Sequence, residues 1–306
     1  MNSDNDTILY ITPLKTTGGK IIGSLTGYIL LATLFWVTSL PFAENAEAQI
    51  PRERAEVDEP VDNIFWASTN IGLRTVRAES AGSLNSTVKH TFGLVEGGID
   101  SFFGLDDGAN TRLGVEYGFT ERFTAGLGRM TFRNVVDIHG QYNILRQTTT
   151  DSMPIELALY ASTGIETLAG TGRSFSERLS YLSSLMVARK FNSLSVQLSP
   201  TLGAFNDVTE GNQDQFFGLG VSANYELNDR LALSAEYLPV LSESNLGTHN
   251  SFGVALNVDT GGHIFQMFFT GSQWHNEQYI MANNRDSFWE GELRFGFNIH
   301  RVFTLR

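Results

Sequence analysis

From about Leu84 to Ile299, the chain consists of short runs in which apolar and polar residues alternate. Between Phe217 and Tyr225 every odd position is apolar, and the even positions hold glycine, serine or asparagine. Because successive side chains of a β-strand point to opposite faces, each run predicts a strand with one apolar face and one polar face. The run from Leu179 to Ala188 is apolar on both parities, so its two faces cannot be assigned from the sequence.

The runs predict about twelve strands, and the connections between them alternate in length. Tight turns fall at residues 120–122, 191–193, 228–230 and 260–262, whereas longer polar loops cover 169–178, 206–215, 241–250 and 271–286. Short turns at one end and long loops at the other are typical of outer-membrane barrels. We therefore predict an all-β fold, a single antiparallel up-and-down transmembrane β-barrel. A secreted soluble β-sandwich, which has the same alternation, is the alternative.

The first 48 residues predict an export signal. Lys15 and Lys20 precede an apolar stretch over residues 21–42, and Ala46-Glu47-Ala48 has the small-x-small pattern of a cleavage site. We expect cleavage after Ala48 and a location in the outer membrane. An uncleaved membrane anchor is the alternative, because the apolar stretch is nearly long enough to span a bilayer.

Residues 49–82 precede the clear strands and predict a periplasmic leader. They begin with a charged segment that carries Pro51 and Pro60, followed by one weak strand pattern between Ile64 and Arg77. A thirteenth wall strand would break the even count that places the tight turns on the periplasmic side. We therefore expect the weak strand to lie outside the bilayer, and the barrel to occupy residues 83–306.

The composition excludes several classes of function. A net charge of −12 argues against a nucleic-acid partner. The absence of cysteine excludes disulfides and thiol catalysis. The partners that we expect are membrane lipid around the barrel, with small polar solutes inside it or a periplasmic protein bound to it.

The polar faces of the predicted strands would line the interior of a membrane barrel, whereas in a soluble sandwich they would be the wet outer faces. Carboxylates outnumber cations among these positions, which favours an acidic, polar lining. The predicted lining residues are Arg112, Glu116, Asp137, His139, Glu156, Glu226, Glu236, Glu290, Glu292 and Arg294. Arg129 is a misfit, because simple alternation places it on the lipid face. Either a bulge at Gly126 or Gly128 turns it inward, or it lies near the rim.

The segment from Gly97 to Gly108 is the most distinctive stretch outside the strands. It predicts a short helix that caps or plugs the barrel mouth, through residues Ile99, Asp100, Phe102, Phe103, Leu105, Asp106 and Asp107. Its aspartates are also potential calcium ligands, but their spacing matches no calcium loop. A loop with turn-forming acidic residues is the favoured interpretation of these aspartates.

Several short motifs are distinctive in combination, and they lie at residues 90–93, 97–108, 111–114, 143–147, 260–266 and 295–299. Together they resemble those of an uncharacterised outer-membrane β-barrel family of the Bacteroidota, a family defined as a domain of unknown function. The resemblance covers most of the mature chain and implies a barrel in the outer membrane. It implies no activity and no catalytic residues.

No combination of residues predicts an active site, a metal site or a cofactor. His139 beside Asp137 is a single histidine on a polar face, and His275 with Glu277 provides two potential ligands, too few for a metal site. We therefore expect a non-enzymatic barrel without cofactors that is a narrow channel or transport accessory for small polar solutes. The alternatives are a structural or partner-docking barrel with a plugged lumen, and an outer-membrane hydrolase that uses His139 or His90.

Overall fold

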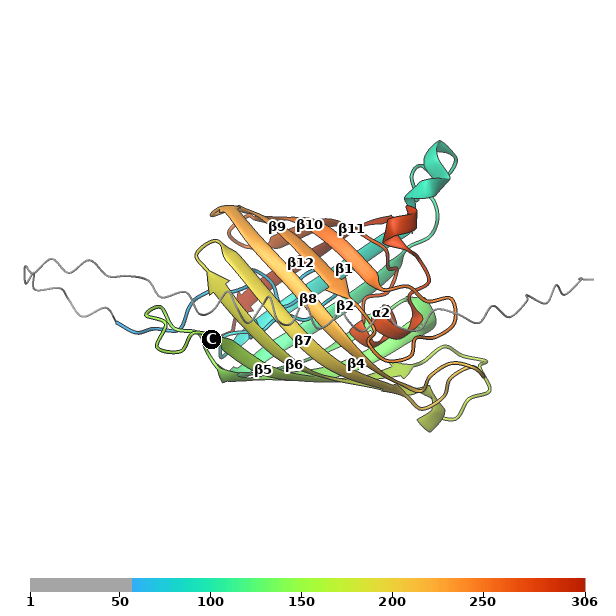
Figure 1. Cartoon of the computed structure of the whole chain (residues 1–306), viewed down its shortest axis with the longest axis horizontal. Coiled ribbons are helices and arrows are strands. Elements are labelled where there is room, and N and C mark those ends of the chain that lie inside the picture. Colours follow the sequence, from blue (N-terminus) through green and yellow to red (C-terminus); the bar gives the residue numbers. More distant parts are fainter. Residues whose placement is uncertain (1–56, 306) are drawn as a thin grey trace, which may run out of the picture. The chain divides into compact units, whose positions relative to one another are not determined.

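The computed structural model describes residues 57–305, which form a closed barrel of twelve antiparallel strands. Each strand pairs with its neighbours in the chain, and β12 pairs with β1 to close the barrel (Figure 1). The predicted fold class and strand number are confirmed. Within residues 57–305, none of the helices has the length and hydropathy that a membrane-spanning helix needs. The predicted signal peptide and its cleavage site lie outside the described residues.

The elements follow one another along the chain with short helices in four of the connections between strands. The strands are β1 Ser83–Leu94, β2 Asn110–Thr120, β3 Phe123–Met130, β4 Val135–Leu145, β5 Glu156–Glu166, β6 Leu179–Phe191, β7 Leu194–Phe205, β8 Gln215–Asn228, β9 Leu231–Leu238, β10 Ser251–Asp259, β11 Ile264–Thr270 and β12 Arg294–Thr304. The helices are η1 Val95–Ser101, η2 Phe132–Asn134, η3 Ser176–Arg178, α2 Glu277–Asn283 and η4 Phe288–Glu290.

Burial alternates along the wall strands as the sequence predicts, with polar side chains inward and apolar side chains outward. In β6, whose faces the sequence left unassigned, the even positions are buried. Three of them are apolar: Met186 and Ala188 pack in a cluster with Phe65 and Val76, and Leu182 packs in another with Ile280. Apolar residues occupy both faces of β6 because part of the barrel interior is itself apolar.

The connections have the predicted arrangement, with tight turns at one end and most of the longer loops at the other. Figure 1 shows the short β8–β9 turn at the left end and α2 at the right end. Arg129 stays on the outer face, because the pairing of β3 with β4 continues without a bulge. Its guanidinium donates to the Asn134 side chain at 3.0 Å, beside the β3–β4 connection. Of the two explanations for Arg129, the position near the rim is therefore the correct one.

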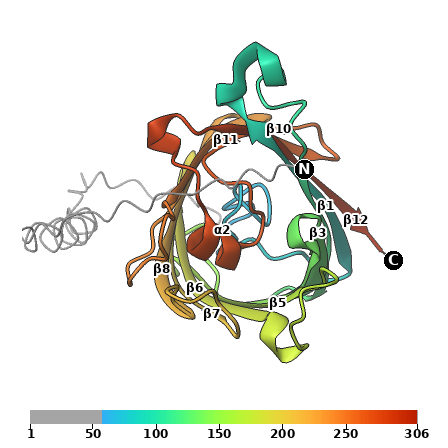
Figure 2. The ribbon, with the colours of Figure 1, turned by 90° about the vertical axis from the view of Figure 1, so that its right-hand side faces the viewer.

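Residues 61–79, which we call the N-terminal insert, lie inside the barrel (Figure 2). Every residue from 64 to 76 is buried, and the segment folds back on itself through a bridge between Thr69 and Arg74. The expectation that this segment is not a wall strand is correct, but its expected place in a leader outside the barrel is wrong. An irregular segment with Phe65, Ile71 and Leu73 can bury these side chains inside the barrel.

A second segment, residues 271–287, folds into the barrel from the long-loop end, and we call it the loop insert. Its helix α2 packs Ile280 and Met281 against Leu73 of the N-terminal insert and Leu238 of the wall. The two inserts meet inside the barrel, where the Arg74 backbone N–H donates to the Glu277 carboxylate. The barrel interior is therefore filled from both ends.

Residues 57–60, which we call the strap, attach the chain to the β4–β5 loop at the tight-turn end. The Thr149 N–H donates to the Glu59 carbonyl at 2.8 Å, and Pro60 forms a bridge with Thr148. The Asp58 carboxylate accepts hydrogen bonds from the hydroxyls of Thr150 and Ser152. The start of the N-terminal insert is thus fixed to the rim.

We expect the strap to detach in acid. Hydrogen bonds, above all from Ser152 and then from Thr150, lower the pKa of the Asp58 carboxyl from 3.8 to about 2. A lowered pKa means that this stabilisation is complete above pH 4 and is lost as the pH falls through about 2. The measurement is carbon NMR of the Asp58 carboxyl, with cross-peaks between the strap and residues 148–152. Asp58→Asn should weaken the cross-peaks at neutral pH and remove their acid dependence; an unchanged pattern in this variant would contradict the assignment.

Candidate functional site

Polar side chains of the wall hold the backbone of the N-terminal insert in place. The Glu236 carboxylate accepts hydrogen bonds from the backbone N–H groups of Gly72 and Leu73, each at 3.0 Å. The Gln197 side chain accepts from the Val76 N–H at 2.8 Å and donates to the Arg74 carbonyl at 2.7 Å. Irregular buried backbone needs such partners, because each unpaired N–H or C=O carries a free-energy cost.

Wall amides complete this set of contacts from other sides of the barrel. Gln141 and Asn143 on β4 both donate to the Val76 carbonyl, at 2.8 and 2.7 Å. Asn298 on β12 donates to the Ile71 carbonyl at 2.8 Å. Residues from several parts of the wall, far apart in the sequence, therefore recognise one short stretch of backbone.

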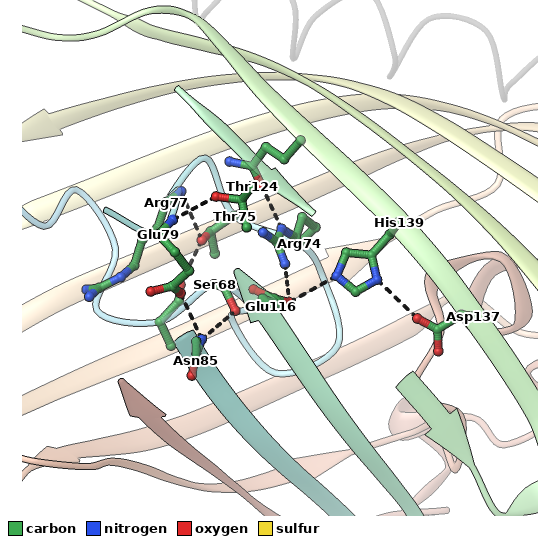
Figure 3. A network of polar contacts seen from close by, with 12 residues as sticks. Ser68, Arg74, Thr75, Arg77, Glu79, Asn85, Glu116, Thr124, Asp137 and His139 are labelled. Carbon is green, nitrogen blue, oxygen red and sulfur yellow. Dashed lines mark hydrogen bonds and ion pairs between the residues drawn. The ribbon is translucent and has the colours of Figure 1, made fainter. Parts of the chain in front are cut away.

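A buried ionic network connects the N-terminal insert to the wall. The Arg74 guanidinium contacts Glu116 on β2 at 2.5 Å and donates to Gln141 at 2.6 Å. Figure 3 shows His139 between Glu116 and Asp137, with a distance of 3.2 Å from the ring to each carboxylate. Loss of one partner from such a network leaves a buried charge without compensation, which is strongly destabilising.

The same network continues to the loop insert. The Arg112 guanidinium on β2 forms a bidentate pair with the Asp137 carboxylate, at 2.9 and 2.5 Å. The Asn276 side chain donates to the same carboxylate at 3.0 Å. Arg74 and Asn276 therefore link the two inserts through wall residues. Beside them is a cavity of about 20 Å³, lined in part by Lys89 and Tyr160. This is about the space that one water molecule needs.

The structure places most of the predicted lining residues on the inner face of the barrel. Buried there are Arg112, Glu116, Asp137, His139, Glu156 and Glu236; Glu226 and Arg294 are half-buried. Glu226 accepts hydrogen bonds from the Trp66 indole at 2.8 Å and from Lys190 at 2.7 Å. Several of these residues hold an insert or pair within the network.

Glu290 and Glu292 do not lie on a strand, and this part of the predicted lining is wrong. β12 begins at Arg294, so the alternation before it belongs to η4 and a turn. Glu290 is exposed, and the Glu292 carboxylate accepts the Ser287 backbone N–H. Trp289, which lies in η4, is also exposed.

The segment from Gly97 to Gly108 does not plug the barrel. It includes the end of η1 and projects beyond the wall in Figure 2, with 82 % of Ile99 and 57 % of Phe102 exposed. Phe103, Leu105, Asp100, Asp106 and Asp107 are exposed as well. Its sequence has the composition of an amphipathic helix, but Phe102 and Phe103 adopt positive φ angles that end the helix. The two inserts fill the interior instead.

The sequence contained a signal for the N-terminal insert in the inward glycines of the wall. A Cβ atom at Gly220 would lie 2.5 Å from Cδ1 of Leu73, and one at Gly253 would lie 2.9 Å from Cδ1 of Ile71. These glycines leave room where the insert approaches the wall. By contrast, nothing in the sequence around Arg74 indicated that this residue is the central cation of a buried network.

Within residues 57–305, neither histidine considered for hydrolysis has a serine as a hydrogen-bond partner. Both ring nitrogens of His139 face carboxylates, and His90 lies on the outer face, stacked on Phe297. The His90 ring bonds the Thr111 hydroxyl at 2.8 Å, and no serine forms a hydrogen bond with either ring among residues 57–305. The geometry at these two rings therefore gives the hydrolase alternative no support.

No curated protein matches this chain. Solved structures similar to it include the NanC porin, which is 12% identical with a TM-score of 0.46 over 73% of this chain and 99% of that one. The KdgM porin is 12% identical, with a TM-score of 0.45 over 72% and 99%. The translocator domain of the autotransporter NalP from Neisseria meningitidis is 12% identical, with a TM-score of 0.42 over 74% and 90%.

The residues that form the closed barrel and its two inserts are almost the same as those matched by the model of a known family. The family described as "Membrane bound beta barrel domain (DUF5777)" matches residues 65–303, from the N-terminal insert to the end of β12. The bacterial phylum implied by the resemblance remains a prediction. The chain belongs to this family of membrane-bound β-barrel domains, whose function is unknown.

Proposed function

We propose that this protein is a gated barrel of the outer membrane, closed at rest, which passes small polar solutes when the N-terminal insert leaves. The observation that carries the proposal is the polar wall behind the insert. Gln141, Gln197 and Asn298 are fully buried against the backbone of the insert. Water can replace the insert at each of them with little net change in hydrogen-bonding free energy.

A permanently seated insert would need only the wall groups that pair with its backbone. The wall also buries ion pairs that do not bind this backbone, such as Arg112 with Asp137, and their desolvation carries a free-energy cost. The outer-membrane location rests on the strand architecture and on the predicted export signal, since β-barrels that span membranes must be closed to pair all backbone groups.

A structural or partner-docking barrel is the second candidate, and one observation favours it. Leu73, Ile280 and Met281 form an apolar cluster with Leu238 where the two inserts meet. This packing opposes the release of either insert, because its loss exposes apolar surface to water. The two candidates differ in whether the barrel conducts once the inserts are removed.

We expect the intact protein to be closed in planar bilayers, and a variant lacking residues 49–79 to conduct ions. Its folding is checked by heat-modifiable gel mobility and by the strand signal in circular dichroism. A second variant also replaces residues 274–284 by a short glycine-serine linker, and its conductance should be larger. If both variants fold and neither conducts, the gated barrel is excluded and the structural barrel is favoured.

A further inference from the structure

The structure contains a cavity of about 510 Å³ among the loops at the long-loop end, and we call it the mouth cavity. We propose that the mouth cavity binds a small solute with a carboxylate on a hydroxylated ring, a sugar acid. This inference rests on the proposed function, because it names the class of solute that the barrel receives. The volume lies within the usual range for small-molecule sites.

Four arginines line the mouth cavity, and they differ in whether they pair with a carboxylate. Arg133 and Arg173 both pair with the buried Glu166 carboxylate, at 2.7 and 2.5 Å, and Arg173 also contacts Asp207 at 3.6 Å. Arg178 and Arg285 have no carboxylate within 4.0 Å among the residues that the structure describes. The first two arginines stabilise the loops, and the last two have guanidinium groups available for an anion.

A guanidinium is well matched to a carboxylate, because its planar N–H groups form two parallel hydrogen bonds with the two oxygens. Among residues 57–305, the Arg178 side chain donates only to the Ser174 carbonyl, at 3.3 Å, and Arg285 is exposed. Both side chains therefore retain donors for a bound solute. A carboxylate that enters the mouth cavity is expected to pair with them.

Four aromatic rings line the cavity beside these arginines. Trp274 stacks on Tyr279 with centroids 4.9 Å apart and planes 18° apart. Phe132 packs its ring against Trp274 at 4.7 Å, and Phe205 against Tyr279 at 5.3 Å, both in edge-on geometry. Trp274 and Tyr279 are buried and hold the group rigid, so the exposed Phe132 and the half-buried Phe205 supply the flat apolar surface, which favours a ring over an extended anion.

Side-chain amides supply the remaining chemistry. Asn212, Gln273 and Asn283 also line the cavity. Each amide offers both donors and an acceptor, so hydroxyl groups can be paired in either direction. Guanidinium, aromatic and amide groups together match a ring that carries one carboxylate and several hydroxyls.

The mouth cavity shares residues with the segment that closes the barrel. Gln273, Trp274, Tyr279, Asn283 and Arg285 belong to the loop insert, and the other lining residues belong to the wall or the outer loops. A solute bound here contacts the loop insert directly. Binding therefore biases the position of the loop insert as far as its affinity differs between the seated and displaced positions.

Calorimetric titration of the intact chain in detergent tests the inference, with glucuronate and glucose as probes that differ by the carboxylate. We expect glucuronate to bind at least about tenfold more tightly than glucose. Arg178→Gln with Arg285→Gln should remove most of this preference. Arg230→Gln is the matched control, because Arg230 is an exposed arginine in the β8–β9 turn at the opposite end.

Equal binding of glucuronate and glucose would overturn the proposal, as would an unchanged preference in the double variant. Inorganic phosphate that binds as tightly as glucuronate would overturn the assignment of a ring-bearing ligand. These measurements need no open pore, so the outcome is independent of the conductance experiment. Glucuronate binding by the intact chain, together with no conductance in either folded deletion variant, would contradict the gated barrel alone.

Discussion

Replacement of Arg74 by methionine is expected to release the N-terminal insert while the barrel stays folded. Arg74 is the cation that the insert contributes to the buried network, and its loss leaves the Glu116 carboxylate without that partner. Removal of one member of a buried ion pair typically costs about 3–5 kcal/mol. The twelve wall strands keep their backbone pairing, so the cost falls on the position of the insert.

Hydrogen exchange of residues 61–79 measures the effect. In Arg74→Met, exchange in this segment should increase by about a hundredfold to a few thousandfold, since 1.4 kcal/mol corresponds to a factor of ten. Exchange in the wall and heat-modifiable gel mobility should not change. Arg77→Met is the matched control, because the Arg77 guanidinium donates to Asn63, Phe65 and Trp66 within the insert itself.

A double variant distinguishes the uncompensated charge from a simple loss of packing. Arg74→Met with Glu116→Gln removes both charges, and the insert should recover much of its protection. If the double variant is as unprotected as the single variant, the stranded carboxylate is not the cause. Unchanged exchange in Arg74→Met would contradict the role of the network altogether.

The barrel could be predicted from the sequence because its signals are local. Alternation with period two and the length of each connection depend only on residues that are close in the sequence. Together they predicted the correct number of strands. The last strand shows the limit of this reasoning. Glu290 and Glu292 continue the alternation of β12 before the strand begins, but η4 and the turn at Gly291, with a φ of 89°, occupy this stretch instead.

The N-terminal insert could not be predicted because its partners are remote. Gly72 bonds Glu236, 164 residues away, and Arg74 bonds Glu116, 42 residues away. Irregular backbone has no period, so its sequence resembled a weak strand. The alternation did show which residues face inward, but a polar inner face is equally suited to water and to a hydrogen-bonded insert. The sequence thus predicted the position of the lining and not what fills the barrel.

A disulfide between Leu73→Cys and Gly220→Cys is expected to lock the barrel shut. A Cβ atom at Gly220 would lie 2.5 Å from Cδ1 of Leu73, and that atom is about 2.5 Å from its own Cβ, so the two Cβ atoms are within about 5 Å of each other. Disulfides join Cβ atoms about 3.5–4.5 Å apart, so a small shift of the insert suffices. The natural chain has no cysteine that could compete for pairing.

Conductance in moderate urea distinguishes the locked from the free insert. Urea weakens apolar and backbone contacts, and the irregular insert should leave at a concentration that the paired strands withstand. The reduced variant and the single variant Leu73→Cys should then conduct, and the oxidised variant should stay closed until a reductant is added. Equal conductance of the oxidised and reduced forms would mean that ions do not pass through the part of the lumen that the insert occupies. The disulfide holds only the N-terminal insert in place. A block of conductance that a reductant reverses would therefore identify release of the insert as the step that opens the barrel.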